Sequence, residues 1–253
     1  MTFTTAAAVA GVAALGVLPA GAPAAARSPR QLANAAIAAA RRETGAHWIL
    51  TGTSKQGRMR FVTEAGQHSG EQQVFVSFGT PAQHDAITAR YRVELHGSTL
   101  ELDGDAQALQ VAAGFSVAAS RREAGRWVAL PRTSPAYASL AVGLSVSSLA
   151  ANIALRGAVT EGRRTVVDGI PVIPLRGTTA PSPGSPASRE ILYVRAEGAP
   201  LPVLAVQPDT SSPASFRLSA ALHITAWGRI PVVPAPARVV AYSPSWLAAP
   251  GRS

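Results

Sequence analysis

The chain of 253 residues contains no cysteine. This absence excludes disulfide bonds, thiolate metal sites and a cysteine nucleophile, and it removes the residue to which an N-terminal lipid anchor would be attached. Lysine occurs once, at Lys55, and aromatic residues make up only 6% of the chain. The remaining basic residues are arginines that occur singly or in pairs. A nucleic-acid binder usually gathers them in one stripe with aromatic residues between, so nucleic acid is not an expected partner.

The net charge is +9, and 47% of the residues are hydrophobic. A chain of this length and composition can bury a full core, and we expect a single β-rich domain. The positive charge favours peripheral contact with an anionic membrane surface, and such contact would weaken as the salt concentration rises.

The N-terminal residues have the pattern of a secretory signal. Residues 6–18 form an apolar run of signal-peptide length that is too short to span a membrane, and Ala24-Ala25-Ala26 offers an A-x-A cleavage site. The residues before this run carry no Lys or Arg, so an uncleaved N-terminal arm is the alternative. We expect a signal peptide at 1–26, one domain at 27–237, a flexible tail at 238–253, and a secreted or cell-envelope protein without a lipid anchor.

Helix signals occur at four places. Ser28-Pro29-Arg30-Gln31 is a capping box with proline at the first helical position, and it predicts a helix that ends before Gly45. The Ala- and Leu-rich residues 105–113, 116–123 and 134–155 predict further helices, each with Asp or Ser at its start. The serines at 145, 147 and 148 indicate a break and a new N-cap inside the last of these.

Strand signals occupy most of the remaining chain. Residues 47–54 and 58–65 predict a hairpin, and residues 73–78 predict a third strand. Residues 87–95 alternate between apolar and polar side chains, which predicts a strand with Tyr91 and Val93 facing the core. The alternation continues at Leu100 and Leu102 and returns over residues 216–224.

We find no motif that predicts catalysis or metal binding. The five histidines lack H-x-x-x-H and H-x-H spacing. Glu101, Asp103 and Asp105 alternate, but a calcium loop needs Gly and Glu where this chain has Ala106 and Ala112, and a turn followed by a helix N-cap explains the acids. Lipase-type, zinc-protease and P-loop motifs are absent. We expect no enzymatic activity, no cofactor, no metal, and a stability that chelators leave unchanged.

Five short segments follow one another in a distinctive order: Gly125-Arg126-Trp127, residues 166–172, Ile191-Leu192-Tyr193-Val194, Leu201-Pro202-Val203 and residues 227–232. Asp168-Gly169 and Glu197-Gly198 supply tight turns. This order resembles the LolA-like superfamily, and within it the actinobacterial LppX/LprG-type secreted lipid-binding proteins, from about Ala46 to Pro236. The resemblance implies an α+β fold: a curved antiparallel half-barrel sheet with helices packed in its concave face.

The same resemblance implies non-catalytic binding or carriage of a lipid or other amphiphile in an apolar cavity. It carries over no catalytic residue and names no protein partner. A tightly filled core is the alternative to a cavity, although small side chains would leave room for acyl chains. The residues that we expect in the cavity wall are Phe61, Val76, Phe78, Tyr91, Val93, Leu140, Leu144, Leu149 and Ile153. The strand residues among them depend on strand phase.

An RseB-like sensor or protein-interaction module is the second function that the resemblance allows. A large apolar patch on the outer face of the sheet would favour that module. A polar outer face over an inner void would favour the carrier.

Overall fold

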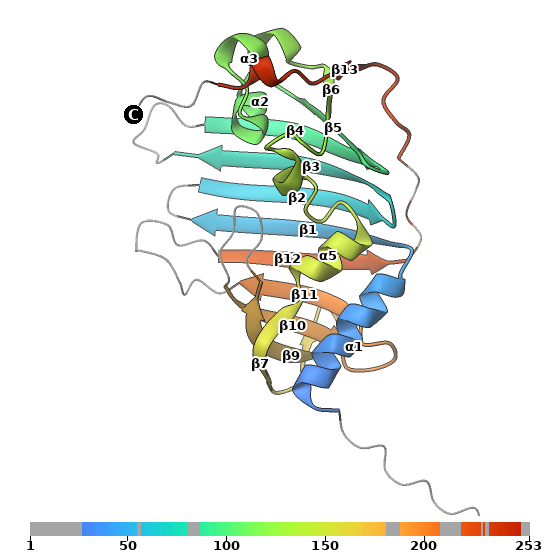
Figure 1. The fold of residues 1–253 in the computed structure, drawn as a ribbon. Helices are drawn as coiled ribbons and strands as arrows, with labels where there is room; N and C mark the ends of the chain where they lie inside the picture. The colour runs from blue at the N-terminus through green and yellow to red at the C-terminus, as the bar shows by residue number, and fades with distance from the viewer. Residues whose placement is uncertain are drawn as a thin grey trace, which may run out of the picture.

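The computed structural model describes residues 27–54, 57–79, 87–180, 188–207, 219–228, 230 and 233–248. Within these residues the chain forms one broad open sheet with helices on one of its faces (Figure 1). The helices are α1 (Pro29–Arg42), α2 (Ala106–Ala113), α3 (Val117–Glu123), α4 (Tyr137–Leu140), α5 (Val146–Asn152) and the 3-10 helix η1 (Pro244–Trp246). The predicted α+β class, with an antiparallel sheet under a helical layer, is confirmed. The expected curvature is not: within the described residues the sheet is open and uncurled and does not form a half-barrel.

The strands are β1 (Gly45–Ser54), β2 (Gly57–Gly66), β3 (Ser69–Phe78), β4 (Ile87–His96), β5 (Thr99–Gly104), β6 (Trp127–Leu130), β7 (Leu155–Glu161), β8 (Thr165–Val167), β9 (Ile170–Thr179), β10 (Arg189–Arg195), β11 (Pro202–Gln207), β12 (Ser219–Trp227) and β13 (Val239–Ala241). Their order is β13-β6-β5-β4-β3-β2-β1-β12-β11-β10-β9-β7, and β8 pairs with β9. β12 pairs with β1 and thereby joins the two halves of the chain into one sheet.

The helix caps and the tight turn that the sequence predicts are found at the predicted residues. Ser28 caps α1 through a reciprocal capping box with Gln31, and Asp105 accepts a hydrogen bond from the Ala108 backbone N–H at the start of α2. Asp168 and Gly169 both have positive φ angles, as a tight turn between β8 and β9 requires. These elements are therefore fixed by residues close in sequence.

The predicted strand phase of β4 is correct. Ala89 and Val93 are fully buried on the face toward the helices, whereas the alternate residues Arg90 and Arg92 are exposed on the other face. We call these the inner and outer faces of the sheet. The inner face carries two main core clusters, one under α1 and α5 and one under α2 and α3.

The expected helix at 134–155 is two short helices with a turn between them. α4 ends at Leu140, α5 begins at Val146, and the Ser145 side chain accepts a hydrogen bond from the Ser148 backbone N–H as the new N-cap. Gly143 lies in the turn with a φ of 79°, and its carbonyl oxygen accepts a hydrogen bond from Trp48 Nε1 at 3.2 Å. The break predicted from the serines is confirmed, and the turn contacts β1 directly.

Residues 238–248 differ from the expected flexible tail, of which the remainder lies outside the described residues. β13 adds to the sheet edge as a parallel partner of β6. Tyr242 and Trp246 pack on Phe115 with ring centroids 6.2 and 5.6 Å away, so aromatic contacts hold this segment on α3 and the adjoining loop. The sequence interpretation missed this because the pairing joins residues more than 100 positions apart. The last of the five segments, residues 227–232, is described only in part. β12 ends at Trp227, and residues 229, 231 and 232 lie outside the described residues.

The predicted signal peptide and residues 181–187 lie outside the described residues as well. Among the residues that are described, no helix combines the length and apolar character needed to cross a membrane.

Replacing Gly143 by Ala should destabilise the protein by about 2–4 kcal/mol. The added methyl group would lie 2.5 Å from the Trp48 ring, and alanine is strained at this positive φ. Gly198→Ala is the matched control, because Gly198 has a φ of 68° with open space around it, so only backbone strain of about 1 kcal/mol is expected. Urea unfolding measures both losses, and equal losses would contradict a tight Trp48 contact.

Candidate functional site

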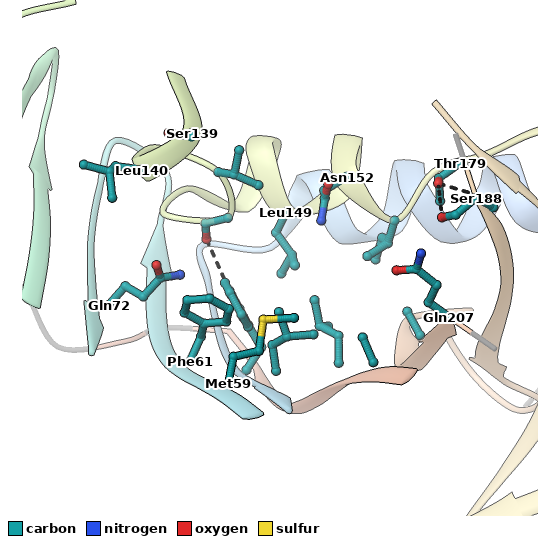
Figure 2. Close-up of a pocket in the computed structure, with 18 of the residues that line it drawn as sticks. Met59, Phe61, Gln72, Ser139, Leu140, Leu149, Asn152, Thr179, Ser188 and Gln207 are labelled. Carbon is teal, nitrogen blue, oxygen red and sulfur yellow. Dashed lines mark hydrogen bonds between the residues drawn. The ribbon is translucent and has the colours of Figure 1, made fainter. Parts of the chain in front are cut away.

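A cavity of about 430 Å³ lies between the middle of the sheet and the helices above it (Figure 2). Small-molecule sites commonly occupy about 300–1,000 Å³. The sheet side of the cavity is formed by β1–β4 and β9–β12, and the helix side by α2, α4, α5 and the turn at Val142 and Gly143. Segments from both halves of the chain therefore surround one space.

The cavity exists because small residues lie in one cross-strand row of the sheet. Met59 pairs with Gly52, Gly52 with Ala220, and Ala220 with Gln207, so the middle of this row carries almost no side-chain volume. The neighbouring row holds Phe61, Leu50, Leu222 and Ala205. The middle of the cavity floor is thus apolar and formed by small residues.

The roof is the inner side of α5. Leu149 and Ile153 lie one helical turn apart and both line the cavity, and Figure 2 shows Leu149 above Met59 and Phe61. The turn before α5 is held down by the Trp48–Gly143 hydrogen bond, and the Gly143 backbone N–H donates to Ser148 Oγ at 2.9 Å. These bonds fix the height of α5 above the sheet.

Five of the nine residues expected in the wall line this cavity: Phe61, Tyr91, Leu140, Leu149 and Ile153. The other four lie elsewhere. Val76 packs with Val74, Ala89 and Ala108 in a separate cluster, and Val93 and Leu144 are fully buried in the core under α2 and α3. Phe78 lies at the end of β3 and is 37% exposed. The three strand residues have the predicted phase but lie along their strands beyond the cavity, and Leu144 lies in the turn between α4 and α5.

One end of the cavity is polar, and the sequence interpretation did not find it. Thr179, Ser188, Glu190 and Gln207 line this end, and the Thr179 and Ser188 hydroxyl groups are hydrogen-bonded at 3.1 Å (Figure 2). These residues come from β9, β10 and β11, which the wall prediction left out. Strand alternation could have predicted these residues, because Glu190 and Gln207 lie two residues from Leu192 and Ala205 and therefore face the same side of the sheet.

Glu190 is the chemically distinctive group of the polar end. Its Oε1 atom is buried and has no hydrogen-bond partner among the described residues. Burial raises the pKa of Glu190 to about 8. The carboxyl group is therefore largely protonated at neutral pH, and it can donate a hydrogen bond to an acceptor placed in the cavity.

The outer face of the sheet carries charged groups in two places. Arg58, Arg60 and Arg90 surround Phe75, and we call these three arginines the basic patch; the Arg58 and Arg90 guanidinium groups lie 5.7 and 5.3 Å from the Phe75 ring. Farther along the same strands, Glu94, His96 and Glu101 bring three potential metal ligands together.

Replacing Glu190 by Gln should flatten the loss of stability at rising pH. Between about pH 4.5 and pH 8 the folded protein keeps a proton on Glu190 that the unfolded chain releases, so wild-type stability falls through this window. The glutamine side chain of the variant holds no such proton. The free energy of unfolding of the variant should therefore fall by on the order of 2–4 kcal/mol less than that of the wild type between pH 5 and pH 8.5. Urea unfolding at the two pH values measures this, and identical losses would show that the folded protein does not hold that proton.

No family model matches the chain, and no curated protein matches it. Among solved structures, LprF from Mycobacterium bovis aligns over 83% of this chain and 97% of its own, with a TM-score of 0.52 and 13% sequence identity. The lipoprotein LppX from Mycobacterium tuberculosis aligns over 81% of this chain and 98% of its own, with a TM-score of 0.48 and 14% identity.

A DUF1329 family protein from Desulfovibrio piger aligns over 79% of this chain and 91% of its own, with a TM-score of 0.30 and 11% identity. Identities this low report on fold rather than on ligand or activity. The match to LprF covers nearly all of that protein and most of this chain. The chain therefore has the fold of LprF, in agreement with the α+β fold that its motifs predicted.

Proposed function

We propose that this protein binds and carries a lipid or other amphiphile outside the cytoplasmic membrane and catalyses no reaction. The observation that supports this most directly is the cavity between sheet and helices, which combines an apolar floor with polar groups at both ends, Glu190 and Gln207 at one and Gln72 and Ser139 at the other. The proposed location rests on the signal-like N-terminal sequence, and the proposed ligand class on the resemblance to secreted lipid-binding proteins.

The energetics of the cavity support an occupant. Enclosed apolar space that is left unfilled destabilises a protein by about 24 cal/mol per Å³ through lost contacts. A ligand that fills this cavity would supply contacts to its apolar lining. The space exists because Gly52 has no side chain and Ala220 has only a methyl group, and a larger side chain at position 220 would fill it. An acyl chain lying over this row would recover the missing contacts.

The polar end favours an amphiphile over a plain hydrocarbon. The protonated Glu190 carboxyl can donate a hydrogen bond, and Gln207 offers both a donor and an acceptor. A ligand with an ester, carboxyl or hydroxyl oxygen near one end would satisfy Glu190, while its chain extends toward Leu149 and Phe61.

The sensor or protein-interaction module has less support. It would be favoured by a large apolar patch on the outer face, but there β2–β5 carry Arg58, Arg60, Arg90, Arg92 and several glutamates. This is the polar outer face over an inner void that favours the carrier.

Replacing Leu149 by Trp should greatly reduce uptake of a long-chain fluorescent lipid, because the indole ring would occupy the cavity. The stability of this variant should change little. Leu144→Trp is the matched control: Leu144 is equally buried but lies outside the cavity, so overpacking should destabilise the protein by about 1–3 kcal/mol while the folded fraction still binds lipid. A wild-type protein that takes up no lipid, or a Leu149→Trp variant that takes up as much, would refute the carrier function.

We also propose that the basic patch contacts anionic membranes during ligand exchange. Arg58, Arg60 and Arg90 are exposed, and arginine binds phosphate groups through paired N–H donors. The patch lies on the outer face of the sheet and the cavity on the inner face, so arginines bound to headgroups would not occupy the cavity.

Replacing Arg58, Arg60 and Arg90 together by Glu should weaken binding to vesicles that contain phosphatidylglycerol, and wild-type binding should itself weaken as salt rises. The control replaces three other exposed arginines, Arg121, Arg163 and Arg164, by Glu and so changes the net charge by the same amount as the test variant. Vesicle co-sedimentation measures both. Equal weakening by the two variants would show that net charge acts without a specific patch.

A further inference from the structure

Four glutamates form a continuous row across the outer face. In the register of β2–β5, Glu64 pairs with Glu71, Glu71 with Glu94, and Glu94 with Glu101. We call these four residues the acidic row. Like charges directly opposite each other destabilise a sheet. In a chain with only 14 acidic residues and a net charge of +9, this arrangement needs a compensating cation.

The protein's own cations compensate only part of the row. Arg92 Nη1 lies 3.9 Å from Glu71 Oε1, and Arg92 Nε lies 3.7 Å from Glu94 Oε1. No arginine is paired with Glu101 among the described ion pairs, and its closest basic group is His96, with Nε2 3.6 Å from Oε2. His96 also lies 3.1 Å from Glu94 Oε2.

Glu101 is the unsatisfied member of the row. It is only 7% exposed, and its Oε2 atom is buried without a hydrogen-bond partner in the described structure. Burial raises the pKa of Glu101, nearby His96 lowers it, and nearby Glu94 raises it again. A buried carboxylate oxygen that faces an imidazole and a second carboxylate is costly unless something binds it.

The three groups have the geometry of a metal site. One ligand atom each from Glu94, His96 and Glu101 lies within 4.8 Å of the others, and the two distances from His96 Nε2 are 3.1 and 3.6 Å. Neighbouring ligands of tetrahedral zinc, bound at about 2.1 Å, are about 3.4 Å apart. An imidazole ligand favours zinc and related transition metals over calcium or magnesium, which prefer oxygen ligands.

We propose that Glu94, His96 and Glu101 bind one divalent transition-metal ion, with zinc as the probe, leaving a fourth position for water. The ion neutralises the end of the acidic row and links β4 to β5 beside their hairpin turn. This replaces the expectation of no metal, which came from spacing along the chain. Glu94-Leu95-His96 on one strand face was the available signal, but Glu101 joins it only through the β4–β5 register.

Thermal unfolding and native mass spectrometry of EDTA-treated, desalted protein test this site, with Zn²⁺ or Ca²⁺ then added. The wild type should bind one Zn²⁺ with a rise in melting temperature, and Ca²⁺ should give no comparable rise. His96→Ala should weaken Zn²⁺ binding by at least about 100-fold. His223→Ala is the control, since His223 lies 3.5 Å from Asp168 on an exposed part of the sheet and should leave Zn²⁺ binding unchanged.

Glu101→Gln separates metal binding from simple burial of a carboxyl group. Without metal, this variant should be at least as stable as the metal-free wild type, because it removes a buried charge, but it should lose the Zn²⁺-dependent rise. A wild type that binds no Zn²⁺ would overturn the proposal. Equal Zn²⁺ affinity in the wild type and His96→Ala would overturn it as well, because the metal would then bind elsewhere.

Discussion

The close approach of residues 143–145 to the sheet is the contact on which the helical layer depends. Trp48 donates a hydrogen bond to the Gly143 carbonyl, a Cβ on Gly70 would lie 2.0 Å from the Leu144 carbonyl oxygen, and Ser145 forms a bridge to Gly66. Backbone lies directly on backbone here, and the helix that the sequence favours over 134–155 is broken at this turn. α5 then leaves the sheet surface and covers the row of small residues below it. The cavity is the space that remains.

The two faces of the sheet divide the chemistry of the protein. The inner face combines an apolar floor with polar groups near both ends of the cavity, Glu190 at one and Gln72 at the other, which suits an amphiphilic ligand. On the outer face, the positive and negative side chains lie at different positions along the strands. Arg60 in the basic patch and Glu64 in the acidic row lie four residues apart on β2, about 13 Å. One set of strands can therefore hold a ligand on one side and ions or headgroups on the other.

Local signals predicted much of the fold, and five of the nine residues expected in the cavity wall lie there. Asp105 and Ser145 are caps that act within three residues, and strand alternation is visible in any short window. What escaped prediction depends on register between distant segments. Tyr242 reaches Phe115 only because β13 pairs with β6, and Glu190 meets the cavity only because β10 and β11 follow β12 in the sheet. Glu101 needs the β4–β5 register to meet His96. A single sequence does not specify such pairings.

Native mass spectrometry of protein purified from its own host, without detergent, tests the central claim most directly. The cavity account predicts a species heavier than the bare chain by the mass of one amphiphile, which collisional activation releases and which Leu149→Trp reduces. A spectrum with only the bare protein mass in both wild type and variant, from protein that also takes up no added lipid, would contradict the account. The space under α5 would then be no lipid site.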